Sequence, residues 1–352
     1  MWVSYKCCGI EQQLRVIWEL ILEVIKMGID LILDKKVNLS SLYQLRILYH
    51  SDMDVDSDNN IWTTSIHRRK SIIVLDDLLN KIPLTYETLD YLEEIRTIHF
   101  TPLEICISSD SNLFSYKIQE LKRTLLQEDD FTKFITISGE TFKERLVEPT
   151  CQSFFPYIKR VKYAFGNLHI LCRNSGGTGK LFKIENKEKY EILDEVKEID
   201  INRNNLYAFR HLSHLGKWYF ELIKIDSKNK QESVILDEKF SYCHFHDTFT
   251  VDDRGRIYMC NSRNRNVGDQ INVFTKEGNK FDEIDVDMYD IQCIQFDKKE
   301  RLIVIGNVDE PYENHSRRCE LRRYFLKENN KIIKKTAPTR IIQQSLDSLW
   351  YS

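Results

Sequence analysis

A short pattern of strands and turns recurs along this chain, and it constrains the fold more than any other feature. Its clearest copy spans Thr248 to Phe281. That copy contains an alternating apolar strand, an Asp-Asp-Arg-Gly turn, a strand beginning Ile257-Tyr258, a polar loop, a third strand and a Lys-Glu-Gly turn. Alternation places every second side chain on one face of a strand. A unit of this size cannot cover such a face alone, so it predicts neighbours of the same kind.

Six copies are visible when the start of the second strand serves as an anchor. The anchors are Ile61, Leu113, Leu168, Leu206, Ile257 and Leu302, at steps of 52, 55, 38, 51 and 45 residues. Steps of this size with several short strands per unit are typical of a β-propeller. The sequence therefore predicts a mainly β fold, with a six-bladed β-propeller over residues 39–335. A two-sheet sandwich also shows frequent turns, but it would not repeat the same order of turns six times.

The copy from Thr248 to Phe281 resembles an NHL repeat in its Asp-x-x-Gly turn, Ile-Tyr strand, arginine-containing loop, Val-Phe strand and Lys-Glu-Gly turn. The first copy, Met53 to Asp77, resembles it more weakly. The other copies keep the strand rhythm without the signature glycines, and 12 glycines are few for this family. The resemblance covers residues 45–330 and implies a propeller of the NHL or WD-repeat type. Such propellers often follow a zinc-binding ubiquitin-ligase module, where this chain has only Cys7-Cys8.

The N-terminal segment, residues 1–38, is predicted to form an amphipathic helix. Charged residues recur every three or four positions opposite an apolar stripe of Ile17, Leu20, Ile21, Val24 and Ile25. The charges leave no stretch of about 18 uncharged residues, so a membrane span is not expected. No basic start and small-residue cleavage site frame the segment as a signal peptide.

The C-terminal segment, residues 336–352, is predicted to be a short helix that docks on the ring. Its apolar residues at helical spacing are Ile341, Ile342, Leu346, Leu349 and Trp350. The ring must also close, and we expect strand exchange between the termini. The outer strand of the last blade would come from residues 40–50 or from residues 331–342.

Cysteine usage and charge indicate an intracellular, cytoplasmic protein. The nine cysteines are odd in number and form no CxxC pair, as in a reducing compartment. The net charge of −3 gives no general attraction to nucleic acid or membrane.

Two motifs suggest ligands but depart from the required pattern. Ser175 to Phe182 reads SGGTGKLF, and a phosphate-binding loop would need Gly at Asn174 and Ser or Thr at Leu181. We interpret it as a hairpin loop. His244 and His246, with His211 and His214, are candidate zinc ligands, yet no sequence feature brings the two pairs together. We therefore predict no cofactor and no metal.

Acidic residues near the starts of the expected inner strands are candidates for a channel site. They are Asp52, Glu104, Glu198, Asp247 and Asp290. In regucalcin-like lactonases inward carboxylates hold a divalent cation, and these acids could bind a hard cation in the same way. The alternative is pairing with Arg160 and Lys197. No residue identifies itself as a general base, so no catalytic residue is assigned, and a metal-dependent lactonase or hydrolase is the second alternative.

The loops between the second and third strands share one face of a propeller and together carry a charge of +6. We predict a non-enzymatic scaffold that binds a protein partner through this face. The predicted contacts are His67, Arg68, Arg69, Arg173, Arg210, Arg263, Arg265, Arg317 and Arg318. RNA binding through the same face is the first alternative, although it would need stacking aromatics and the loops offer only Tyr116 and Tyr312. Acidic connections at 191–200 and 281–290 end on this face and would leave a surface of mixed charge.

Overall fold

The computed structural model describes residues 25–43, 50–65, 72–86, 95, 97–101, 104–108, 112–124, 131–145, 157–173, 179–185, 188–202, 205–214, 217–228, 230–236, 248–261, 269–308 and 318–332. The chain divides into two compact units, Met1–Asp30 with Lys327–Ser352, and Leu31–Leu326. Of the first unit, the description covers only strand residues 25–30 and 327–332. No helix in the described ranges is long and apolar enough to cross a membrane.

The described chain is nearly all β, as predicted, and it forms five sheets. The first contains β2 (His50–Val55), β3 (Ile61–Ser65), β4 (Ile72–Leu75) and β5 (Lys81–Ile82). The second contains β7 (Thr97–Phe100), β8 (Ile105–Ser108), β9 (Asn112–Thr124), β10 (Phe131–Arg145) and β6 (Leu84–Tyr86), which joins β10 in parallel.

The third sheet has seven strands: β11 (Tyr157–Ala164), β12 (Asn167–Arg173), β13 (Gly179–Glu185), β14 (Glu188–Asn202), β15 (Asn205–His214), β16 (Lys217–Ile225) and β17 (Gln231–Ile235). The fourth contains β18 (Phe249–Val251), β19 (Ile257–Asn261), β20 (Gln270–Phe274) and β21 (Lys280–Asp285). The fifth contains β22 (Tyr289–Phe296), β23 (Leu302–Asn307), β24 (Cys319–Ile332) and β1 (Ile25–Asn38), and the short helix α2 (Leu39–Tyr43) follows β1.

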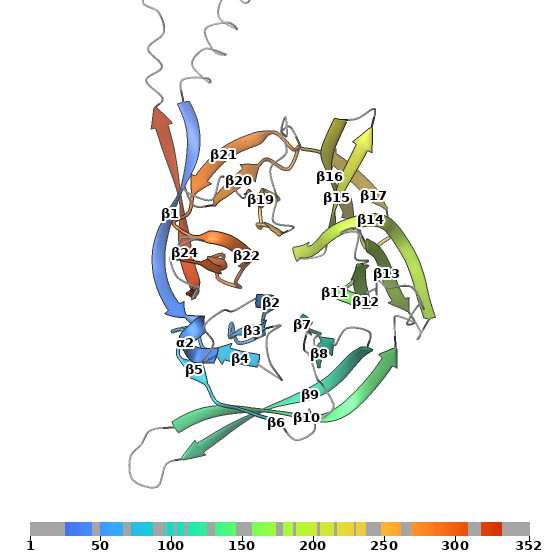
Figure 1. The fold of residues 1–352 in the computed structure, drawn as a ribbon, viewed down its shortest axis with the longest axis vertical. Helices are drawn as coiled ribbons and strands as arrows, with labels where there is room; N and C mark the ends of the chain where they lie inside the picture. Colours follow the sequence, from blue (N-terminus) through green and yellow to red (C-terminus); the bar gives the residue numbers. More distant parts are fainter. Residues whose placement is uncertain are drawn as a thin grey trace, which may run out of the picture. The chain divides into compact units, whose positions relative to one another are not determined.

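Within the Leu31–Leu326 unit the sheets follow one another around a centre (Figure 1). The innermost strands are in contact in the closed order β2, β7, β11, β14, β18, β22 and back to β2. The seven-stranded sheet supplies two of them, because β14 pairs with β13 over its first part and with β15 over its second part. Both pairings meet at Val196, next to Glu195, whose φ is 56°. A closed cycle of inner strands is the arrangement of a propeller-type fold.

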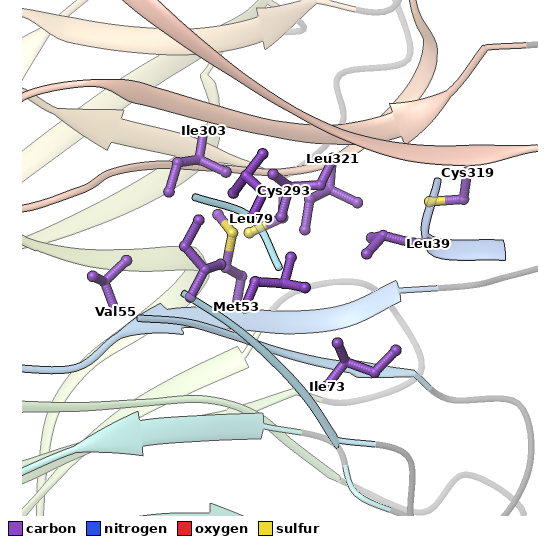
Figure 2. Close-up of a cluster of buried hydrophobic side chains, with 12 residues drawn as sticks. Leu39, Met53, Val55, Ile73, Leu79, Cys293, Ile303, Cys319 and Leu321 are labelled. Carbon is purple, nitrogen blue, oxygen red and sulfur yellow. The ribbon is translucent and has the colours of Figure 1, made fainter. Parts of the chain in front are cut away.

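Apolar side chains fill the joints between neighbouring sheets. The joint between the first and last sheets contains Met53, Ile73 and Leu79 from one side and Ile303 and Leu321 from the other (Figure 2). Each sheet therefore buries its apolar face against the next one, which is the driving force for closing the cycle.

A hydrogen-bonded turn follows several strands and explains the anchors seen in the sequence. An aspartate opens the turn, and its Oδ1 accepts the backbone N–H groups two and four residues later. These aspartates are Asp56, Asp76, Asp226, Asp252 and Asp297. The fourth turn residue is left-handed at Asn59, Leu79, Gly255 and Glu300. Glycine is favoured there but is not required.

The helix predicted for residues 1–38 is wrong from Ile25 onward, where the chain is strand β1. Residues 1–24 lie outside the description. β1 is the outer strand of the last sheet, next to β24, so strand exchange between the termini is confirmed. The segment is neither of the two expected, because residues 39–43 form α2 and β24 is itself the third strand of this sheet. An open edge of β24 offers backbone partners that outweigh helical periodicity. The C-terminal helix predicted for 336–352 lies outside the described residues.

The second copy is shifted by one strand from its predicted position. β7 is its inner strand and β8 its second strand, so Ile105 is the anchor and Leu113 opens the third strand, β9. The loop expected at 115–120 lies inside β9. The shift has a local cause: the turn from Thr101 to Glu104 has no aspartate, and the Thr101 hydroxyl accepts the Glu104 N–H instead. The loop expected at 210–217 is also mostly strand, since β15 ends at His214 and β16 begins at Lys217.

Candidate functional site

Charged and polar side chains from the inner strands meet at the axis of the ring. This axial cluster consists of Asp52 and Asp54 on β2, His99 on β7, Arg160 and Lys162 on β11, Glu198 and Asp200 on β14, Thr250 on β18 and Gln295 on β22. All but Gln295 are buried. Charges so far from water require partners within the chain.

Arg160 links two of the predicted channel acids. Its guanidinium lies 3.2 Å from Asp52 Oδ1 and 3.1 Å from Glu198 Oε1. Lys159 Nζ lies 3.1 Å from the second Glu198 oxygen and donates to the main-chain oxygen of Lys197. Burial would lower the pKa of Arg160, but Asp52 and Glu198 raise it above its ordinary value. The alternative, pairing with Arg160, is confirmed for Asp52 and Glu198; the lysine side chain beside Glu198 is Lys159, and Lys197 contributes its main-chain oxygen.

Asp54 and His99 form a second pair beside Arg160. His99 Nδ1 lies 2.6 Å from Asp54 Oδ2, and His99 Nε2 accepts the N–H of Tyr163. Because Nε2 is an acceptor, the ring keeps its proton on Nδ1, facing the carboxylate. Gln295 donates to the other oxygen of Asp54. Burial alone would raise the pKa of Asp54, but His99, Lys162 and Gln295 hold it well below its ordinary value.

Lys162 and Asp200 form the third pair, with Lys162 Nζ 3.8 Å from Asp200 Oδ1. Thr250 donates its hydroxyl to the other Asp200 oxygen at 2.9 Å. Burial raises the pKa of Asp200, and Lys162 opposes that shift. Burial would lower the pKa of Lys162, but Asp54 and Asp200 raise it. The axial cluster thus carries its own counter-charges.

The position of these side chains follows from the need to pair the main-chain N–H groups of the inner strands. Each inner strand has an edge that faces the axis, and its N–H groups need acceptors. Side chains on the preceding inner strand, or next to it in the case of Thr248, supply them: Asp52 accepts the N–H of Ile98, Asp54 that of Phe100, His99 that of Tyr163, and Thr248 that of Ile294. The axial residues therefore hold neighbouring inner strands together.

A divalent cation does not fit the carboxylates at the axis. A guanidinium stands between Asp52 and Glu198, where an ion shared by them would have to lie. Glu104 is in the turn after β7 and accepts from the Ser115 hydroxyl. Asp290 lies 3.4 Å from the Asn307 amide nitrogen, and Asp247 is outside the described ranges. Within those ranges no three His, Cys, Asp or Glu side chains are placed to hold a metal ion. Of the four predicted acids that the structure describes, Asp52 and Glu198 share Arg160 at the axis, whereas Glu104 and Asp290 have other partners.

A small hollow adjoins the axial cluster where β14, β18 and β22 end. Its volume is about 130 Å³, and Asp200, Thr250 and Gln295 contribute to its wall together with Asn202 and Asp252. Asp252 is held by Arg256, whose Nε donates to it at 2.6 Å. The hollow brings part of the axial cluster close to solvent.

Three of the nine predicted contact residues are described. Arg173 ends β12. Arg210 is on β15, where its Nε donates to Glu221 at 3.0 Å across to β16. Arg318 precedes β24, with its side chain 52% exposed and 3.7 Å from Glu320. His67, Arg68, Arg69, Arg263, Arg265 and Arg317 lie outside the description. Strand β3 ends at Ser65, shortly before His67, β19 ends at Asn261, shortly before Arg263, and β23 ends at Asn307.

The remaining candidates have simple outcomes. The run after Gly179 is strand β13, as predicted for a hairpin rather than a phosphate-binding loop. His211 and His214 are on β15, and His244 and His246 lie outside the described residues.

Sequence reasoning missed a second, partly buried charge cluster, at the joint between the first and last sheets. This closure cluster consists of Asp34 on β1, Asn59 and Asp77 in turns of the first sheet, Asp297, Lys299 and Arg301 in the β22–β23 turn, and Arg323 on β24. Arg323 Nη2 lies 2.7 Å from Asp34. Arg301 contacts Asp77 and Asp297, and its Nη1 is 3.7 Å from Asp34. The Asp-x-x-x-Arg spacing of the last turn was the available signal.

Comparison with solved structures agrees with the propeller-type fold. The chain is similar to a luciferin-regenerating enzyme, with a TM-score of 0.55 and 12% identity over 82% of this chain and 94% of that one. A calcium-binding regucalcin from Agrobacterium tumefaciens gives 0.49 and 14% over 79% and 91%, and the WD40 propeller domain of Doa1 gives 0.41 and 11% over 84% and 97%. No protein-family model and no curated protein matches the chain.

Proposed function

We propose that this chain is a non-enzymatic scaffold, a six-bladed propeller that presents the loops between second and third strands to a protein partner. The observation that carries this proposal is the use of the axial carboxylates. Arg160 and Lys162 already compensate their charge, and Asp52 and Asp54 also accept inner-strand N–H groups. A site committed to holding the ring together favours a rigid platform over a reaction chamber.

Six blades follow from treating the seven-stranded sheet as two blades that share β14. The cycle of inner strands then contains β2, β7, β11, β14, β18 and β22, one for each blade. Their second-to-third-strand loops all leave from the same end, because each second strand runs antiparallel to its inner strand. Loops gathered on a rigid support are the usual means by which propellers bind.

The exposed guanidinium of Arg318 and the position of Arg173 at the end of β12 support the loop face as the contact surface. Arg210 contributes less, since its guanidinium is already bonded to Glu221. Arginine is enriched at the centres of protein interfaces, where its planar head pairs with carboxylates.

A lactonase-type function would need open carboxylates at the axis for a divalent cation or an activated water. Guanidinium and ammonium groups occupy the positions beside these carboxylates, and His99 Nε2, the ring's basic nitrogen, accepts a main-chain N–H. The axial residues give no support to the alternative of RNA binding, which concerns the loop face.

The proposal can be tested with two charge-reversal variants of the full chain. Arg173→Glu/Arg318→Glu alters the loop face. Lys228→Glu/Lys276→Glu alters exposed turn lysines after third strands, at the other end of the ring. Partners captured by the wild type are identified, and their affinity for each variant is measured. We expect about tenfold weaker binding to the loop-face variant and little change for the control.

Equal losses in both variants, or no loss in either, would remove the loop face from consideration. Two further assays address the other functions. Hydrolysis of an aliphatic lactone on addition of Ca²⁺ or Zn²⁺ would contradict the scaffold. Binding of an oligouridine RNA that weakens steeply with salt would replace the protein partner by RNA.

A further inference from the structure

His169 is a buried histidine with few polar partners among the described residues. It lies on β12, its side chain is completely buried, and neither ring nitrogen has a hydrogen-bonded side-chain partner among the described residues; the main chain of Asn167 is the polar group beside the ring. Lys162 of β11 and Lys183 of β13 lie opposite it in register. A buried polar group of this kind costs folding free energy, so its presence requires an explanation.

An apolar cluster packs beside His169 along its own strand face. Strand alternation places it on the same face as Leu171, which packs with Leu181, Leu206 and Ala208 in one cluster. This cluster fills the joint where β11–β13 face β14–β16, here called the β14 joint. The ring of Phe165, which packs against the same cluster, meets the imidazole edge to face at 6.2 Å. Such an environment favours the neutral imidazole.

The charged groups near His169 do not offer it a counter-ion. Lys183 on β13 is paired with Glu185 at 2.9 Å. Lys162 on β11 is paired with Asp200 of β14, whose other oxygen accepts the Thr250 hydroxyl of β18. Both lysines repel an imidazolium, and the carboxylates beside them are already used. A protonated His169 would add a third positive charge to this part of the ring.

We propose that His169 makes the β14 joint acid-sensitive: the joint is tight while the imidazole is neutral and loosens when it is protonated. The two blades on either side of the joint share strand β14, which stays hydrogen-bonded to both β13 and β15. Loosening therefore separates the packed side chains of the joint and leaves the strand pairing intact. Loops carried by these blades would then move relative to the rest of the loop face.

The direction and range of the effect follow from linkage. Burial lowers the pKa of His169 from 6.5 to about 4, the main chain of Asn167 opposes the shift, and Lys183 adds to it. The unfolded chain therefore binds a proton first. The contribution of the neutral His169 to the free energy of unfolding is fully present above the ordinary histidine pKa, and it is lost as the pH falls from there towards 4. At pH 5 the loss corresponds to roughly 30-fold in the folding equilibrium constant.

The effect of Asp200 on stability has the opposite dependence on pH, so the test must compare the wild type with His169 variants that retain Asp200. Burial raises its pKa, so its protonation adds stability as the pH falls. This contribution is common to the wild type and to any His169 variant, and it cancels in their difference. Asp54 stays ionised in the same range, because its pKa is depressed.

The test compares urea unfolding of the wild type, His169→Leu and His169→Gln between pH 7 and pH 4.5. We expect the wild type to lose roughly 20-fold more in its folding constant between pH 7 and pH 5 than either variant, because a small part of the loss is already present at pH 7. His169→Leu should also exceed the wild type at pH 7, because it removes buried nitrogens that lack side-chain partners. His169→Gln keeps a polar group but does not titrate, so it serves if the leucine variant fails to fold.

Hydrogen exchange at pH 5 locates the change, with wild type and variants measured under identical conditions. Faster exchange in β12, β13 and β15 of the wild type alone would support the proposal. Identical pH dependence in all three proteins would overturn it, as would acid loosening that begins in β1 and β24.

Discussion

The axial cluster and the closure cluster both place buried arginines between carboxylates, yet their carboxyl groups behave differently. Burial raises the pKa of Asp52 at the axis, and Arg160 only partly opposes it. At the closure joint burial also acts on Asp77, but Lys299 and Arg301 hold its pKa well below the ordinary value. Asp77 is partly exposed, whereas Asp52 is not. Where water still reaches a carboxylate, an arginine stabilises it at small desolvation cost.

The two clusters also connect different parts of the chain. Axial residues connect neighbouring inner strands, so their stabilising contacts are distributed around the ring. Closure residues join Asp34 to Arg323, near the two ends of the Leu31–Leu326 unit. The comparison teaches that the axial cluster has a high desolvation cost and links inner strands all around the ring. The closure cluster has a lower desolvation cost and acts at a single joint.

The largest expected effect is at the axis. Arg160→Met leaves Asp52 and Glu198 buried without their shared counter-ion, and we expect a loss of about 3–5 kcal/mol in the free energy of unfolding. Urea unfolding at pH 7 measures it. Adding Asp52→Asn and Glu198→Gln to this variant should recover most of the loss. A single variant as stable as the wild type would show that the axial charges are not coupled.

Arg323→Met tests the closure, with an expected loss of about 2–3 kcal/mol. The loss is smaller because Asp34 is partly exposed and keeps Arg301 at 3.7 Å. Hydrogen exchange should accelerate in residues 31–38 of β1. Arg322→Met is the matched control, since the neighbouring Arg322 pairs with Glu320 instead of Asp34. Equal exchange in β1 for both variants would contradict a closing role for Arg323.

The opposite pKa shifts of Asp77 and Asp52 predict opposite acid behaviour. Because the folded-state pKa of Asp77 is lowered, its contribution is present above about pH 3.8 and is lost as the pH falls below that value. Asp77→Asn should therefore cost about 1 kcal/mol at pH 7, allowing for its exposure, and less in acid.

Asp52 has a raised pKa, so its contribution is present in acid and is lost as the pH rises through that pKa. The deficit of Asp52→Asn relative to the wild type should grow in acid, where that of Asp77→Asn shrinks. Stability measured from pH 7 to pH 3 checks both variants. Parallel trends would mean that the two clusters do not differ in the way described.

The smallest effect concerns backbone strain in the β22–β23 turn, which carries part of the closure cluster. Glu300 has a φ of 57°, and Glu300→Gly should stabilise the protein by about 0.5–1 kcal/mol. Lys298→Gly, in the same turn without a positive φ, should destabilise it by a similar amount. Thermal unfolding distinguishes the two signs, and a destabilised Glu300→Gly would show that the turn is not strained.

The sequence predicted the propeller and part of the axial cluster. Repeated apolar alternation identified the strands, and Asp52, Glu198 and Arg160 were singled out as neighbours at the axis. It did not reveal that Asp34 belongs to a strand, because residues 25–38 also fit a helical periodicity. The closure cluster was missed for the same reason, since one of its carboxylates was assigned to the wrong element. His99 was missed because its strand, β7, was not recognised.

What the sequence determined by itself are the turns and the faces of the strands. An aspartate that accepts N–H groups two and four residues later acts within five residues, so the sequence is sufficient to specify it. Only the tertiary structure decided which segment completes the last sheet and which charges meet. Those contacts join residues 289 positions apart, as for Arg323 and Asp34, and depend on an open strand edge that exists only after the other sheets have packed.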